Sequence, residues 1–258
     1  MHHVRQGSGE PLVLVHGVGH HHQAWRPVVE RLGDFDVLAT DSPGFGRSPA
    51  LPAGVDPTVW AYTDAFQAFF AEQGLDRPHV AGNSMGGAIA LELARRGAVR
   101  SATAFSPAGF WTAGELRYAQ LSLGVLAGLP RPLRPAVVRT ARTRAGRAAL
   151  FAQLVKRPGD VPADEAVSTL RDAWAAPAFA GALAAFDHYE FTAGNELDDA
   201  RVTVAWGDTD RLLPVRRQAP RARAALPRAR HVLLDAGHLP YTDAPDAVAA
   251  LVRETART

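Results

Sequence analysis

The chain has 258 residues, 47% of them apolar and 21% charged, and a formal net charge of only +2. This size and composition fit a globular chain with one main core and an insertion. Cysteine is absent, which excludes disulfides, thiolate metal sites and a cysteine nucleophile. Only Lys156 among the 28 basic residues is a lysine. The arginines raise the isoelectric point without a large charge at neutral pH, so we expect no nucleic-acid partner.

The sequence has no stretch near the roughly 20 apolar residues that a membrane helix needs. The apolar run Pro11–Val15 is too short for the core of a signal peptide and fits a strand. We therefore expect no membrane partner. Together with the lack of cysteine, this favours a cytoplasmic location.

Short β-branched runs alternate with segments of helical periodicity along most of the chain. The predicted strands are residues 12–15, 35–39, 78–82, 101–105, 201–206 and 230–234. The predicted helices are residues 23–32, 58–73, 85–96, 215–226 and 245–255. This alternation predicts an α/β fold with a mostly parallel central sheet flanked by helices.

The alternation stops between residues 109 and 196, which contain many alanines and several prolines but no convincing strand. We interpret this stretch as a helical insertion between two strands of the sheet. The predicted domains are therefore a core, residues 1–108 and 197–258, and a helical cap, residues 109–196.

The run Gly82-Asn83-Ser84-Met85-Gly86 fits the G-x-S-x-G pattern of a nucleophile on a sharp strand-to-helix turn. An apolar strand precedes it, and a helix rich in small residues follows. Glycines on either side leave room for the neighbouring chain. The context predicts that the Ser84 hydroxyl projects from the carboxyl end of the sheet, where ligands bind in open α/β folds.

A serine nucleophile needs a general base, and His238 is the best candidate because it follows the predicted strand 230–234. An acid must then orient that histidine, and the loop after strand 201–206 offers two carboxylates, Asp208 and Asp210. We favour Asp210, which lies further into the loop, and expect Asp208 to bond turn amides. The order Ser84, Asp210, His238 is typical of α/β-hydrolases.

With these motifs the chain closely resembles the cap-bearing branch of the α/β-hydrolase superfamily. The resemblance rests on five segments: His16-Gly17-Val18-Gly19, residues 41–48, residues 82–87, residues 206–210 and Gly237-His238-Leu239-Pro240. It implies that the amides of Val18 and Met85 form the oxyanion hole. It also implies that residues 109–196 are the family's helical cap. One departure is the short region before His16, which leaves only Met1–Gln6 for the usual leading antiparallel strands.

A serine at position 84 favours hydrolysis of a carboxylic ester, lactone or related acyl bond of a small, largely apolar substrate. Relatives that cleave carbon–halogen bonds or epoxides resemble this chain but use aspartate there. The same segment also resembles carbon–carbon bond hydrolases that act on ring-cleavage products of aromatics. A third possibility is a non-hydrolytic binding or lyase member of the fold. We expect a monomer or homodimer that needs neither cofactor nor metal.

The aromatic residues of the predicted cap are candidates for lining an apolar substrate pocket, although they could equally form the cap's own core. The candidate pocket residues are Phe110, Trp111, Trp174, Phe186 and Leu239. His188 and Glu190 are less favoured candidates. Residues 131–157 hold eight basic and no acidic side chains, which fits a solvated face or attraction of anionic substrates. We expect no metal at His20-His21-His22, because adjacent residues rarely converge on one ion and no carboxylate cluster accompanies them.

Overall fold

The computed structural model describes residues 1–192, 197 and 201–257. Its centre is a seven-stranded sheet in the order β1-β3-β2-β4-β5-β6-β7. All neighbouring strands are parallel except β1, which runs antiparallel to β3. The strands are β1 His3–Gln6, β2 Glu10–Val15, β3 Phe35–Thr40, β4 His79–Asn83, β5 Ser101–Phe105, β6 Arg201–Gly207 and β7 Arg230–Leu234. The predicted α/β class is confirmed, and the short leading region supplies the single antiparallel strand β1.

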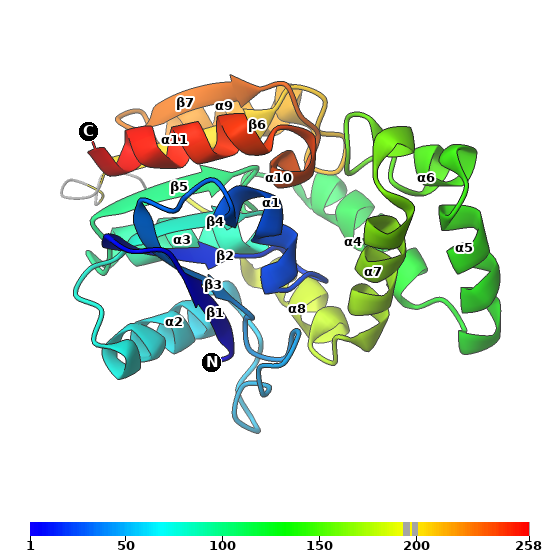
Figure 1. Ribbon diagram of the computed structural model, residues 1–258, viewed down its shortest axis with the longest axis horizontal. Coiled ribbons are helices and arrows are strands. Elements are labelled where there is room, and N and C mark those ends of the chain that lie inside the picture. Colours follow the sequence, from blue (N-terminus) through cyan, green and yellow to red (C-terminus); the bar gives the residue numbers. More distant parts are fainter. Residues whose placement is uncertain (193–196, 198–200, 258) are drawn as a thin grey trace.

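The central strands are buried on both faces of the sheet, which explains why their sequences are continuous apolar runs. All four residues of 12–15 are 0% exposed. Helices α2 Val59–Gln73 and α3 Met85–Arg95 pack together on one side, whereas α1 Arg26–Val29 packs against α11 Pro245–Arg257 (Figure 1). Helices α9 Val215–Ala225 and α10 Pro240–Asp243 follow β6 and β7.

The strand register brings the carboxyl ends of the parallel strands to one edge of the sheet. The residue pairs Val15 and Gly82, Asn83 and Phe105, and Gly207 and Leu234 end successive ladders. The loops carrying residues 16–20, 84, 210 and 238 therefore leave the sheet at this shared edge.

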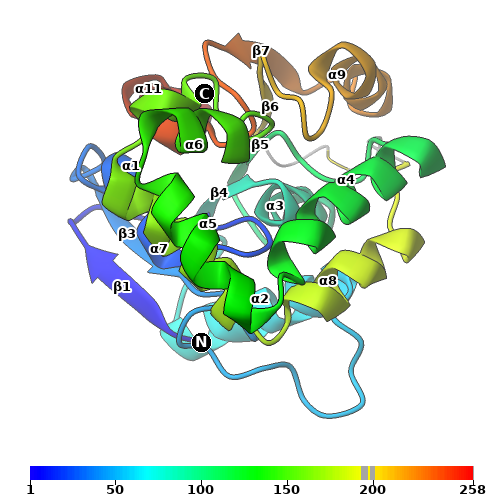
Figure 2. The ribbon, with the colours of Figure 1, turned by 90° about the vertical axis from the view of Figure 1, so that its right-hand side faces the viewer.

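Residues 113–188 contain helices and connecting loops but no strand. The helices are α4 Ala113–Ala127, η2 Arg131–Leu133, α5 Arg134–Ala141, α6 Arg144–Leu150, η3 Pro158–Asp160, α7 Ala163–Ala175, α8 Phe179–Ala185 and η4 Phe186–His188. They gather at one end of the molecule, which faces the viewer in Figure 2. Residue 196, where the predicted cap ends, lies outside the described residues.

The predicted helix over residues 23–32 is wrong in detail. A 3-10 helix, η1 His22–Trp25, precedes a single α-helical turn that ends at Val29. Pro27 supplies no backbone donor in the first turn of α1. The amides of Arg31 and Leu32 then bond carbonyls three residues back, which tightens the end of the segment. Among the described residues, no helix is both long and apolar enough to cross a membrane.

Candidate active site

Ser84 occupies the turn between β4 and α3 in a strained backbone conformation, with φ 56° and ψ −114°. The neighbouring strand fixes this turn, because the Ser84 amide donates to the Phe105 carbonyl at 2.9 Å. A Cβ added to Gly82 would lie 2.1 Å from the Gly86 carbonyl oxygen, and one added to Gly86 would lie 2.2 Å from that of Val15. Both glycines are therefore required by close backbone approach, and the turn that they permit leaves Ser84 7% exposed.

His238 and Asp210 form a buried pair, with 2.9 Å between His238 Nδ1 and Asp210 Oδ2. The other carboxylate oxygen of Asp210 accepts hydrogen bonds from the amides of Leu212 and Leu213 at 3.0 and 2.9 Å. Asp208 lies elsewhere: its half-exposed carboxylate pairs with Lys156 Nζ at 2.8 Å. Of the two carboxylates in this loop, Asp210 is thus the one in contact with the histidine.

Asn83 connects the nucleophile turn to the histidine loop, a role that sequence reasoning missed. Its side-chain amide donates to the carbonyl of His238 at 2.9 Å and to that of Phe105 at 3.2 Å. The backbone of His238 is therefore fixed beside the residue that precedes Ser84. Asn83 stands at the second position of the G-x-S-x-G pattern, where any residue is allowed, so the pattern gives no signal for this contact.

The loop after β2 passes directly beside Ser84. A Cβ on Gly17 would lie 3.2 Å from the Ser84 Cβ, so only a glycine fits there without displacement. Val18 follows in this loop, and Met85 begins α3, whose first-turn amides have no partner within the helix. Val18 therefore neighbours Gly17 and Met85 neighbours Ser84 along the chain, and their role as an oxyanion hole stays a prediction.

His16 stabilises this loop through two hydrogen bonds of its ring. Its Nε2 accepts from the Ser42 amide at 2.9 Å, and its Nδ1 lies 2.7 Å from the Gly17 carbonyl. Burial lowers the pKa of His16 to about 4, so its ring is neutral at pH 7. Since Nε2 accepts, Nδ1 carries the proton and donates to Gly17. His16 thereby holds the loop in place through uncharged hydrogen bonds.

The candidate pocket residues do not gather around one cavity. Phe110 packs on Trp206, with 6.3 Å between ring centroids, and Trp111 packs on Phe186 at 5.3 Å. Trp174 lines a cavity of about 450 Å³ between α4, α7 and α8. The candidate Leu239 instead contributes to a separate cavity of about 340 Å³ next to the histidine loop, as does His20. His188 and Glu190 are exposed.

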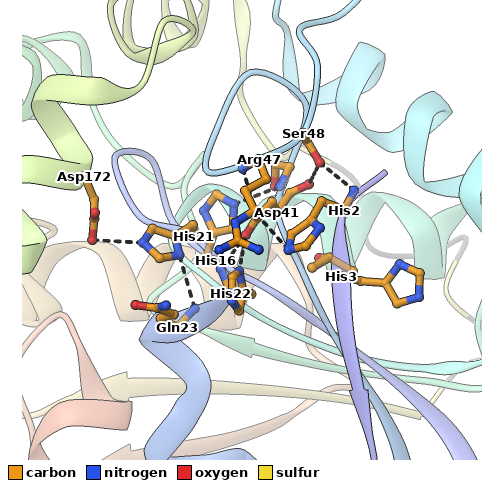
Figure 3. Close-up of polar contacts among 12 residues, drawn as sticks. His2, His3, His16, His21, His22, Gln23, Asp41, Arg47, Ser48 and Asp172 are labelled. Carbon is orange, nitrogen blue, oxygen red and sulfur yellow. Dashed lines mark hydrogen bonds and ion pairs between the residues drawn. The ribbon is translucent and has the colours of Figure 1, made fainter.

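The three consecutive histidines point to different partners. His20 borders the 340 Å³ cavity, and its buried Nδ1 has no hydrogen-bond partner. His21 pairs with Asp172 of α7 at 3.0 Å, and His22 pairs with Asp41 at 2.7 Å (Figure 3). The expectation that no carboxylate accompanies the run is therefore wrong. Only the fold reveals these partners, because they lie far away in the sequence.

The basic segment 131–157 is partly neutralised by carboxylates from elsewhere in the chain. Arg144 pairs with Asp160 at 3.0 Å, and Arg157 pairs with Asp235 at 2.7 Å. The guanidinium of Arg134 lies 5.1 Å from the centre of the Trp174 ring. Much of this charge therefore serves local contacts, and attraction of anionic substrates stays a prediction.

The sequence matches the alpha/beta hydrolase family over residues 12–251. This chain is an alpha/beta hydrolase. The dihydrolipoyllysine-residue acetyltransferase component of the acetoin cleaving system of Cupriavidus necator is 30% identical over 265 positions, covering 97% of this chain and 64% of that protein. Lipase 3 of Moraxella sp. is 34% identical over 110 residues, covering 42% of this chain and 35% of the lipase. The chain thus spans less than two thirds of the length of these curated relatives.

Solved structures similar to this alpha/beta hydrolase include several hydrolases. A bacterial membrane phospholipase A is 27% identical with a TM-score of 0.74, covering 98% of this chain and 81% of that one. The enol-lactonase of Burkholderia xenovorans, at 20% identity and a TM-score of 0.76, covers 98% and 95%. The 2-hydroxy-6-oxo-6-phenylhexa-2,4-dienoate hydrolase of Rhodococcus, at 23% and 0.76, covers 100% and 94%. The last two are under 25% identical and therefore show a shared fold alone.

Proposed function

We propose that this alpha/beta hydrolase is a serine hydrolase that cleaves a carboxylic ester, lactone or related acyl bond of a small, largely apolar substrate. The observation that carries the proposal is the positive φ of 56° at Ser84, at the end of a buried strand. Such strain persists only where the surrounding structure enforces it, and it is concentrated at functional sites. The buried pair of His238 and Asp210 at the same edge of the sheet supports this interpretation.

In the proposed mechanism, His238 Nε2 accepts the hydroxyl proton while Ser84 Oγ attacks the substrate carbonyl carbon. The amides of Val18 and Met85 donate to the oxyanion that forms. Asp210 accepts from His238 Nδ1, which leaves Nε2 free to act as the base and stabilises the imidazolium.

His238 then returns the proton to the leaving alcohol, and the carbon–oxygen bond breaks to leave an acyl group on Ser84. A water molecule gives a proton to His238 and attacks this acyl group. Collapse of the second tetrahedral intermediate releases the acid and restores the Ser84 hydroxyl. Desolvation in the buried site strengthens each of these charge interactions.

Labelling by a fluorophosphonate probe tests the nucleophile. We expect the wild-type chain to be labelled and Ser84→Ala to be unlabelled. Ser106→Ala is a matched control, because Ser106 is also buried with a positive φ, at the end of neighbouring β5. Absence of label on the folded wild-type chain, or labelling that survives in Ser84→Ala, would refute the proposal and favour a non-hydrolytic role.

A substrate comparison then separates acyl hydrolysis from the carbon–carbon cleavage that the same three residues could perform. The assay compares p-nitrophenyl esters of several chain lengths with a vinylogous diketone acid. We expect turnover of the esters. Cleavage of the diketone acid without ester turnover would reverse the assignment while leaving Ser84 as the nucleophile.

A further inference from the structure

Three polar side chains from distant parts of the sequence meet beside the loop that follows β3 (Figure 3). His2 lies just before β1, His22 begins η1, and Asp41 follows β3. One ligand atom from each of these residues lies within 4.8 Å of the other two. None of them belongs to the proposed catalytic set.

The carboxylate of Asp41 is fully buried and held in one orientation. Its Oδ1 accepts from the His22 amide at 2.8 Å, and its Oδ2 accepts from the Arg47 amide at 2.9 Å. The His22 ring nitrogen Nδ1 lies 2.7 Å from the same Oδ1. A negative charge is therefore fixed in a poorly solvated position.

The backbone of His2 is fixed beside this carboxylate, whereas one nitrogen of its ring has no hydrogen-bond partner. Its backbone amide donates to Ser48 Oγ at 2.8 Å, and Ser48 Oγ donates to the Asp41 carbonyl at 2.6 Å. The ring atom His2 Nε2 is buried, lacks a hydrogen-bond partner and lies 3.9 Å from Asp41 Oδ2. Buried polar atoms are almost always paired, so this nitrogen beside a carboxylate is available as a ligand.

We propose that His2, His22 and Asp41 bind a divalent transition-metal ion of the Zn²⁺ type. Two imidazoles and one carboxylate match the ligand preference of Zn²⁺, with water in the remaining position. Ligands about 2.1 Å from a tetrahedral ion lie roughly 3.4 Å apart, so small side-chain movements would close this cluster around a metal. His22 Nδ1 lies 2.7 Å from Asp41 Oδ1, so binding through this nitrogen requires the neutral tautomer that carries its proton on Nε2.

The ion would be structural, because none of its three ligands belongs to the proposed catalytic set and it would reach the active-site loop only through intervening hydrogen bonds. Asp41 immediately precedes Ser42, whose amide donates to His16 Nε2. His16 in turn holds the Gly17 carbonyl in the loop beside Ser84. A metal at this site would reduce the mobility of that loop. It would take no part in the proposed serine chemistry.

Zinc titration of the full chain without a histidine tag, in competition with a chromogenic chelator, tests the site. We expect one Zn²⁺ per chain, with binding at least about 10-fold weaker in His2→Gln and in His22→Gln. His3→Gln is the matched control, since His3 is adjacent but packs its ring on Phe69 at 5.2 Å, and it should bind like wild type. Arg47→Gln should bind more tightly, because this guanidinium lies within electrostatic range of His2.

Visible absorption of bound Co²⁺ provides a second readout, because tetrahedral coordination gives intense bands that His2→Gln should lose. Circular dichroism shows whether each variant is folded. His2 is more than a quarter exposed, so His2→Gln is expected to fold even if His22→Gln does not. Equal zinc affinity in wild type and folded His2→Gln, or an equal loss in His3→Gln, would overturn the proposal.

Discussion

The carboxyl edge of the sheet and the helices of residues 113–188 hold their side chains very differently. At the sheet edge Ser84, Asp210 and His238 are only 7%, 4% and 2% exposed, and buried hydrogen bonds orient the pair of Asp210 and His238. Helix α4 instead leaves Leu121 60% and Val125 73% exposed. With the proposed function, we expect the sheet edge to determine the reaction and the helical segment to determine which substrate reaches it.

The largest expected effect tests whether the sheet edge carries the reaction, by removing the proposed general base, His238. We expect His238→Ala to lower kcat/KM for an ester by roughly 10⁵-fold, because no other group would accept the serine proton. Steady-state kinetics measure this loss. His231→Ala is the control, since His231 lies near the amino end of β7, away from the active edge. A similar loss in both variants would point to general destabilisation.

The next largest effect separates the two carboxylates of the loop after β6. Asp210→Asn should lower kcat by about 10⁴-fold, because the amide would favour the wrong tautomer of His238. Asp208→Asn removes only the pair with Lys156 and should leave kcat nearly unchanged. Stopped-flow or steady-state assays on the two folded variants give the ratio. A larger loss in Asp208→Asn would reverse the assignment of the orienting acid.

A smaller effect concerns the stability of the sheet edge in acid. The folded-state pKa of His16 is about 4, lowered by burial from an ordinary 6.5. Between these pH values the unfolded chain binds a proton that the folded chain does not. The His16 contribution to the free energy of unfolding is therefore complete above pH 6.5 and is lost toward pH 4, a total of about 3 kcal/mol.

Urea denaturation across that pH range measures this slope. His16→Gln should show a shallower fall in the free energy of unfolding, although it starts from a less stable chain. Equal slopes in the two chains would contradict the assignment of a buried neutral histidine.

The smallest expected effect lies in the helical segment. Trp174→Ala enlarges the 450 Å³ cavity and should change the ratio of kcat/KM for long over short esters by roughly 10-fold. Fluorophosphonate labelling of Ser84 should persist. If all esters lose activity equally, the cavity does not select substrate, and the contrast between the two regions weakens.

Sequence patterns predicted the sheet well, because buried parallel strands are continuous β-branched runs ended by turn residues. The predicted strands 101–105 and 230–234 coincide with β5 and β7, and the others differ by at most two residues at either end. The order of Ser84, Asp210 and His238 could be recognised because each follows a predicted strand. The parallel register then brings the loops that carry them to the same edge of the sheet.

Other features depend on contacts that no local pattern encodes. A continuous helix over residues 23–32 would need a backbone donor at Pro27, which proline lacks, and the structure has a 3-10 helix followed by a single α-helical turn there. The meeting of His2, His22 and Asp41 requires β1 to pair with β3, a tertiary event between distant segments. The individual helices between residues 113 and 188 stayed unpredicted because alanine favours a helix at almost any register.

The chain segments that lead into and out of the helical segment lie side by side next to α3. The Phe191 amide donates to the Gly109 carbonyl at 3.0 Å, and the Tyr189 hydroxyl donates to Glu92 on α3 at the same distance. The residues between Gly109 and Phe191 therefore form an insertion whose two ends are hydrogen-bonded to each other. Such an insertion can be lengthened, shortened or exchanged without altering the register of any strand. Substrate specificity can therefore change while the sheet and the proposed catalytic residues stay the same.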